Sequence, residues 1–229
     1  MNIKRLIQGI ATALILMPII ASAAGSGWYI AADVGQSRFS DVAAQADQIV
    51  MQIPQLGVQP SSVTNSDTGY RLTGGFQVNP YLGLEFSFVN FGQATITENN
   101  AELLPCGPNC FVVMSGTVAA RLKAHAWTLA GTGMYPLNDD WSLWAHIGIV
   151  NANMNLAINV IPPVASYISS IDESSSGRLT TTYGLGVRWI FSDHWSARLG
   201  WDQYRNLGNS NTIGEYTVNL DSIGIVYRF

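Results

Sequence analysis

The chain has 229 residues, of which 48% are hydrophobic and only 11% are charged, and its formal net charge is −4. An average soluble domain carries about 25% charged residues, so the composition is unusual for a soluble protein. The acidic balance argues against nucleic acid as a partner, because a nucleic-acid-binding chain needs cations against the phosphates.

The first residues have the layout of a secretory signal peptide. A basic start, Met1–Arg5, precedes a mostly apolar run, Leu6–Ile20, and the small residues Ala21-Ser22-Ala23. The apolar run is too short for a spanning helix. We therefore predict a signal peptide over 1–23 and a mature domain over 24–229. Losing the two basic residues leaves 9 Lys and Arg against 15 Asp and Glu, a net charge of −6.

The mature chain contains no apolar run near the roughly 18 residues that a membrane helix needs. An exported, apolar chain with few charges can still cross a membrane as a closed β-barrel, in which every backbone group is paired within the wall.

Eight segments alternate between apolar and small or polar residues with the period of a β-strand. The second face of each carries Gly, Ser, Thr, Arg, Asp or Glu, which is typical of a barrel lumen. The sequence thus predicts an all-β fold, an eight-stranded antiparallel transmembrane β-barrel. The segments are Trp28–Arg38, Thr68–Val78, Leu82–Gln93, Thr117–Tyr135, Trp141–Met154, Leu179–Phe191, Trp195–Tyr204 and Glu215–Phe229.

The connections alternate between short and long. Short connections with turn-forming residues are Asn79–Tyr81, Leu137–Asp140 and Ser192–His194. Long ones are Phe39–Asp67, Ala94–Gly116 and Asn155–Arg178, and Leu207–Gly214 is intermediate. This pattern indicates short periplasmic turns and long extracellular loops. An even strand number would place both ends of the barrel segment in the periplasm.

The alternation in the last segment predicts which of its side chains face lipid and which face the lumen. Tyr227 and Phe229 would face lipid in the periplasmic aromatic girdle, whereas Gly224 and Arg228 would face the lumen. The opposite parity would place Arg228 in lipid, at a cost of about 2–4 kcal/mol near the bilayer midplane.

The same parity predicts a set of charged side chains inside the barrel. Such charges should pair, because an unpaired buried charge is costly. We interpret the set as a polar plug that fills a narrow lumen, and the alternative is a narrow, gated ion path. The acidic members are Asp33, Glu85 and Asp202, and the basic members are Arg71, Arg188, Arg198 and Arg228.

Several motifs, in this order along the chain, resemble the OmpA-like transmembrane barrels. They are Gly74–Glu85 (GGFQVNPYLGLE), Met134–Asp140 (MYPLNDD), Ala197–Leu199, Asn211–Gly214 and Tyr227–Phe229. The resemblance implies an integral outer-membrane protein without catalytic activity. It also implies contacts with another cell, a host surface or phage through the loops. The ending, with Gly224, Tyr227 and Phe229, resembles the signal read by the barrel-assembly machinery.

The chain departs from the family's pattern in two respects. Longer members carry a periplasmic peptidoglycan-binding domain after the barrel, and this sequence ends at Phe229. The family's interior gate of Glu, Lys, Glu and Arg matches Glu85, Thr132, Arg188 and Arg198, so one Glu–Arg pair is kept. We expect Glu85 and Arg198 to form an interior pair.

Two cysteines lie in the second long connection, in Cys106-Gly-Pro-Asn-Cys110. In an exported chain this spacing favours a disulfide that closes a turn. A metal site would need further ligands, and a redox pair would need a thioredoxin-type surrounding.

A lipid-modifying enzyme is the third class of function. His194-Trp195-Ser196 places a His near a Ser, but in a predicted periplasmic turn, and His146 is expected to pack inward beside Trp144. We therefore expect no enzyme and no cofactor. We expect a monomer in outer-membrane lipid with a structural and surface-interaction role, and a narrow diffusion pore as the alternative.

Overall fold

Nine antiparallel strands make up almost all of the described chain. The computed structural model describes residues 26–40, 42, 62–99, 117–161, 171–209 and 214–229. No helix in these ranges is long and apolar enough to span a membrane. The strands are β1 (Gly27–Ser40), β2 (Ser62–Thr64), β3 (Ser66–Gln77), β4 (Leu82–Asn99), β5 (Thr117–Pro136), β6 (Trp141–Ile161), β7 (Ile171–Ile190), β8 (Trp195–Asn209) and β9 (Gly214–Arg228).

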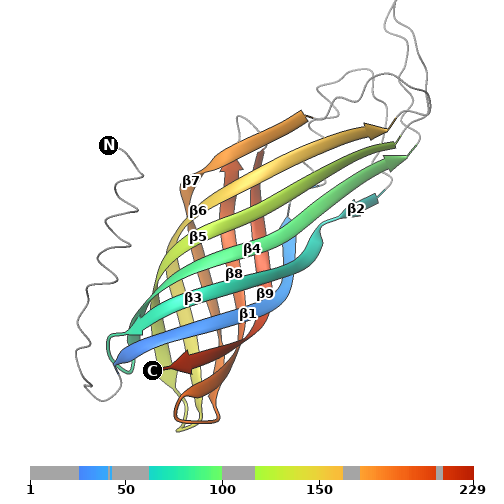
Figure 1. Ribbon diagram of the computed structural model, residues 1–229. Helices are drawn as coiled ribbons and strands as arrows, with labels where there is room; N and C mark the ends of the chain where they lie inside the picture. Colours follow the sequence, from blue (N-terminus) through green and yellow to red (C-terminus); the bar gives the residue numbers. More distant parts are fainter. Residues whose placement is uncertain (1–25, 41, 43–61, 100–116, 162–170, 210–213) are drawn as a thin grey trace, which may run out of the picture.

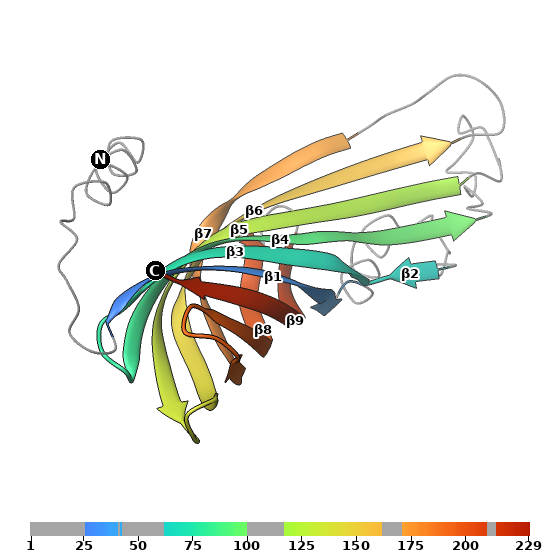
Figure 2. The same cartoon turned by 60° about the horizontal axis from the view of Figure 1, so that its bottom comes forward.

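Eight of these strands close into a barrel (Figures 1 and 2). Neighbours in sequence pair around the ring, and β1 pairs with both β3 and β9, which joins the two ends. The short β2 lies outside the ring and pairs only with β4. The predicted fold class, an eight-stranded antiparallel barrel, is confirmed.

The apolar face of each strand points outward, as the alternation predicts. Leu84, Ile147 and Leu199 are 54%, 70% and 58% exposed on the wall. In a membrane these side chains meet lipid rather than water, which removes the penalty that such exposure would carry in a soluble protein.

Three short turns join strands at one end of the barrel, which we call the turn end. In the first, the Asn79 side-chain oxygen accepts hydrogen bonds from the backbone N–H groups of Tyr81 (2.9 Å) and Leu82 (2.8 Å). Asn138 repeats the arrangement in the second turn, at 3.0 Å to Asp140 and 2.7 Å to Trp141. These asparagines satisfy the turn backbone locally, which explains why four residues are enough.

The strands on one side of the barrel are longer than the alternation predicts. β6 has 21 residues, and a tilted strand needs only about 9–11 to cross the hydrocarbon layer. Figure 1 shows β4 to β7 extending past the other strands at the end opposite the turns, which we call the loop end. The expectation that Asn155–Arg178 forms one loop is wrong, because Asn155 pairs with Ser174 and Ile158 with Ile171. Residues 94–99, which were also expected in a loop, belong to β4.

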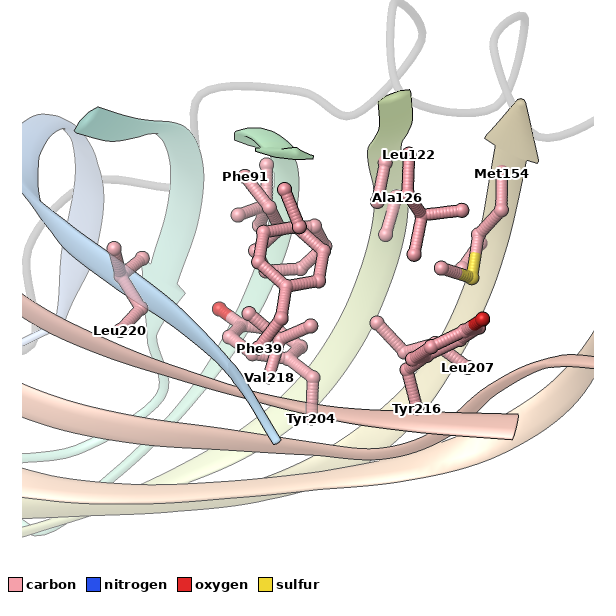
Figure 3. Packing of buried hydrophobic residues seen from close by; sticks show 14 of the residues in the cluster. Phe39, Phe91, Leu122, Ala126, Met154, Tyr204, Leu207, Tyr216, Val218 and Leu220 are labelled. Atoms are coloured by element: carbon pink, nitrogen blue, oxygen red, sulfur yellow. The ribbon is translucent and has the colours of Figure 1, made fainter. Parts of the chain in front are cut away.

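The lumen is divided into two layers. A cluster of buried apolar side chains fills the half nearer the loop end (Figure 3). Its members, which we call the apolar layer, include Phe39, Val89, Phe91, Tyr204, Val218 and Leu220. The prediction of a polar lumen along every strand is therefore wrong for this half. Here both strand faces are apolar, because one meets lipid and the other packs against the opposite wall.

Candidate functional site inside the barrel

Five charged side chains from four strands meet in the middle of the lumen. They are Asp33 on β1, Arg71 on β3, Glu85 on β4, and Arg198 and Asp202 on β8. All are buried. Each occupies an inward position of its strand, so the parity that sends apolar neighbours into lipid sends these charges into the lumen.

Asp33 is the centre of the group. Its Oδ2 atom lies 3.0 Å from Arg71 Nε and 2.6 Å from Arg198 Nη2. Its Oδ1 atom accepts a hydrogen bond of 2.7 Å from Arg198 Nε. The Arg198 guanidinium therefore binds Asp33 through two nitrogens, which is a strong, directional form of ion pair.

The contacts continue on both sides of Asp33. Arg71 Nη1 lies 2.9 Å from Asp202 Oδ2, and His146 Nε2 lies 3.3 Å from Asp202 Oδ1. Arg198 Nη1 lies 3.1 Å from Glu85 Oε1, which also accepts a 2.8 Å hydrogen bond from the Tyr29 hydroxyl. We call this chain of contacts, from His146 to Tyr29, the lumen network.

Trp144 packs against the lumen network. Its ring lies 5.9 Å from the Arg71 guanidinium carbon, 5.6 Å from that of Arg198, and 5.5 Å from the stacked ring of His146. Both arginines thus gain a cation–π contact in addition to their ion pairs.

Glycines make room for these large side chains in a narrow lumen. A Cβ atom on Gly224 would lie 2.0 Å from Asp33 Oδ1, and one on Gly75 would lie 2.2 Å from the Tyr29 ring. A Cβ atom on Gly200 would lie 2.5 Å from the Trp144 ring. The close approach of carboxylate and rings to the wall therefore requires glycine at these positions.

Arg188 and Arg228 lie apart from the lumen network. Arg188 Nε donates a 2.8 Å hydrogen bond to Ser196 Oγ, and its Nη1 lies 3.7 Å from Met134 Sδ. Within the described ranges, neither arginine has a carboxylate within ion-pair distance. The predicted set of seven charges thus separates into a connected group of five and two isolated arginines.

The remaining sequence candidates lie elsewhere. The Tyr227 ring contacts the rings of Trp195 (4.9 Å) and Phe229 (5.2 Å) at the turn end. His194 and Ser196 do not form a pair: His194 is exposed and its Nδ1 contacts the Arg228 backbone oxygen, whereas Ser196 is buried against Arg188. Cys106 and Cys110 lie outside the described residues.

Sequence reasoning missed Tyr29, Trp144 and His146 as members of the site. The alternation places all three side chains on inward faces. It does not predict which charged side chains they contact there. The assembled group has no paired nucleophile and base among the described residues. The group instead forms ion pairs that link β1, β3, β4 and β8 to one another across the lumen.

Comparison with known proteins points to one family. The sequence model of the OmpA-like transmembrane domain matches residues 23–229. Outer membrane protein A of Shigella flexneri is 26% identical over 229 residues, covering 99% of this chain and 56% of the relative. The protein of the same name from Salmonella typhi is 25% identical, with 99% and 55% covered. The chain therefore spans about half the length of the curated relatives it matches.

A solved structure supports the fold. The crystal structure of Neisserial surface protein A aligns with a TM-score of 0.50 at 11% identity, covering 90% of this chain and 100% of that one. At this identity the similarity concerns the architecture alone.

Proposed function

The chain belongs to the family of OmpA-like transmembrane domains, and from this premise we propose that it is a closed, non-enzymatic barrel with a structural and surface-interaction role. It is an outer-membrane protein. The loop end would face the exterior and the turn end the periplasm.

The observation that carries the proposal is that two layers of side chains fill the lumen, the lumen network and the apolar layer. The lumen network crosses the barrel with buried ion pairs. Nearer the loop end, the apolar layer packs side chains such as Phe91 and Val218 to 0% exposure. A dehydrated apolar layer is a barrier to ions and polar solutes, because they would have to shed their water without compensation. This favours a closed barrel over the alternative of a narrow diffusion pore.

The separation of His194 from Ser196 supports the non-enzymatic reading. A hydrolytic Ser needs a base within hydrogen-bond reach, and the Ser196 hydroxyl is held instead by Arg188. No cofactor is part of the proposal.

The role at the surface would be carried by the loop end. At this end β4 to β7 extend past the other strands of the wall (Figure 1). A host surface or phage is the class of partner we propose for this end, through loops that lie outside the described residues. Insertion by the barrel-assembly machinery through Gly224, Tyr227 and Phe229, and a monomeric state, are part of the same proposal.

Two experiments test this function. The folded barrel in liposomes should give no more swelling in small sugars or amino acids than empty liposomes, and solute-dependent swelling would establish a pore.

The intact folded barrel should also capture a surface partner that a protease-shaved barrel does not. Equal capture by both forms would place the contact away from the loops.

Export through residues 1–23 and the Cys106–Cys110 disulfide stay predictions. Amino-terminal sequencing of the outer-membrane form should begin at Ala24. Thiol labelling of the denatured, unreduced protein should find no free cysteine, and two labels per chain would refute the disulfide.

A further inference from the structure

Two basic side chains lie on the outer wall of the barrel, on β5, one of the strands that extend past the rest of the wall at the loop end (Figure 1). Arg121 and Lys123 are exposed and alternate with the buried Leu122 and Ala124. They therefore point away from the lumen, on the same side as the lipid-facing Trp127. We call Arg121 and Lys123 the basic row.

The basic row begins just beyond the apolar part of the wall. On β5 the lipid-facing stretch runs from Tyr135 at the turn end to Trp127, and these rings are 67% and 46% exposed. The nine residues of this stretch match the roughly 9–11 that a tilted strand needs to cross the hydrocarbon layer, and aromatic rings at both ends are typical of the two interfaces. The next outward residue, His125, packs its ring 6.1 Å from that of Phe88. The basic row follows, at the level of the lipid headgroups.

The neighbouring strands place uncharged polar residues beside the basic row. On β4, Gln93 is the register partner of Lys123 and Thr95 that of Arg121. On β6, Asn155 is the register partner of Lys123. Side chains at paired positions share one face of the sheet, so their amides and hydroxyls can donate hydrogen bonds to the same ligand as the two cations.

The basic row has more positive charge than its neighbours balance. In the part of the chain that the structure describes, neither cation has a carboxylate within ion-pair distance. The register places one acidic residue on this face, Asp172, two strands from Arg121 across β6, which is a backbone separation of about 10 Å. Lys123 has Ser174 at the corresponding position.

The opposite side of the wall has balanced charges. Arg38 on β1 and Arg205 on β8 are exposed as well. The strand between them, β9, carries Asp221 and Glu215 on its outward face, and Arg38 contacts Asp221 at 3.4 Å. The excess of positive charge on the outer wall is therefore a feature of the β5 side.

We propose that the basic row binds the phosphate groups of a glycolipid of the outer leaflet, whose acyl chains lie against Trp127 and Phe88. An arginine binds phosphate through two N–H groups and a lysine adds a point charge. The proposal rests on the loop end facing the exterior. It does not depend on whether the lumen is closed.

The position of the basic row favours a lipid over a soluble polyanion such as a sulfated glycan. The row lies on the lipid-facing side of the wall, directly beyond the Trp127 and Phe88 rings, which pack 4.9 Å apart. A lipid meets the cations with its headgroup and these rings with its acyl chains, whereas a soluble polyanion has no apolar part to place against them.

The test measures binding of lipid A to the intact folded barrel in a neutral detergent by native mass spectrometry. Lipid A with both phosphates is compared with enzymatically dephosphorylated lipid A, and heparin and inorganic phosphate are titrated as soluble anions. A cation near an anionic lipid surface contributes about fivefold in affinity. The wild type should therefore bind the phosphorylated form about 30-fold more tightly than the dephosphorylated form.

Variants assign the preference to the basic row. Arg121→Gln combined with Lys123→Gln should bind both forms of lipid A with the weaker affinity. Arg38→Gln combined with Arg205→Gln is the matched control, because it removes the same charge from the opposite side of the wall, and it should bind as the wild type does. Folding is checked by the band shift on unheated gels. If the first double variant does not fold, Lys123→Gln alone should lose about fivefold.

Several results would overturn the proposal. One is equal affinity of the wild type for the two forms of lipid A. Another is a phosphate preference that the basic-row variant keeps, or that the control variant loses to the same extent. Binding of heparin or inorganic phosphate that needs the basic row, without a preference for phosphorylated lipid A, would assign the row to a soluble anion instead.

Discussion

Asp33→Asn is the change that tests the lumen network most sharply. The substitution keeps the size of the side chain and removes one negative charge from between two buried guanidiniums. Asp33 contacts Arg71 once and Arg198 through two nitrogens. The neutral amide cannot balance either arginine, and its NH₂ group would point a donor at other donors.

The expected loss of stability follows from the partners that remain. Breaking a buried ion pair by removing one partner typically costs about 3–5 kcal/mol. Arg71 keeps Asp202 and Arg198 keeps Glu85, so we expect the lower end, about 3 kcal/mol. Glu85→Gln removes one ion pair only and should cost less than Asp33→Asn.

Asp221→Asn is the matched control for the same chemical change. Asp221 pairs with Arg38 at 3.4 Å, but their side chains are 45% and 58% exposed. An exposed pair contributes about 0–1 kcal/mol. The assay is urea unfolding of the barrel in detergent, followed by the shift between folded and unfolded bands on unheated gels. Equal midpoints for Asp33→Asn and Asp221→Asn would refute the claim that the lumen network stabilises the barrel.

Three further changes test other parts of the structure. Gly224→Ala should lower the unfolding midpoint because its methyl group would overlap the Asp33 carboxylate, whereas Gly74→Ala, whose methyl group meets nothing within 4 Å, should not; equal midpoints would contradict the close approach. Phe91→Ala should cost about 3–5 kcal/mol, because the ring is fully buried and 4.7 Å from that of Tyr204, and a change below 1 kcal/mol on urea titration would argue against a packed apolar layer. Tyr29→Phe removes a hydrogen bond to a carboxylate and should cost about 1.5–3 kcal/mol by the same titration, with no loss expected if Glu85 is held by Arg198 alone.

The membrane-spanning part of the fold was predictable because lipid imposes a strict rule on alternate residues. Leu84 and Glu85 could be assigned to opposite faces from their order alone, and they lie on those faces. The rule weakens toward the loop end. Val89 and Phe91 point inward and are apolar, so the two faces no longer differ in polarity. Toward the loop end, segments such as 155–161 are held by pairing with neighbouring strands, and such pairing leaves no pattern in the sequence of one strand.

The partners within the lumen were less predictable than its members. Parity identifies Asp33, Arg71 and Arg198 as inward. Which of these side chains touch depends on their positions along the barrel axis, and these are set by the register between the strands. β1 and β8 are separated in the ring by β9, and the contact between Asp33 and Arg198 is possible because Gly224 on β9 has no side chain. A sequence read one strand at a time does not reveal such a three-strand relation.

The central claim is that two independent layers close the lumen, and recording in planar bilayers tests it most directly. Wild-type barrel and the Glu85→Ala variant are compared at equal protein density, with a general porin as positive control. Glu85→Ala disrupts the lumen network and leaves the apolar layer intact, so both barrels should show no steady conductance steps. Steady conductance of the wild type would contradict a closed barrel, and conductance of Glu85→Ala alone would show that the lumen network is the only barrier.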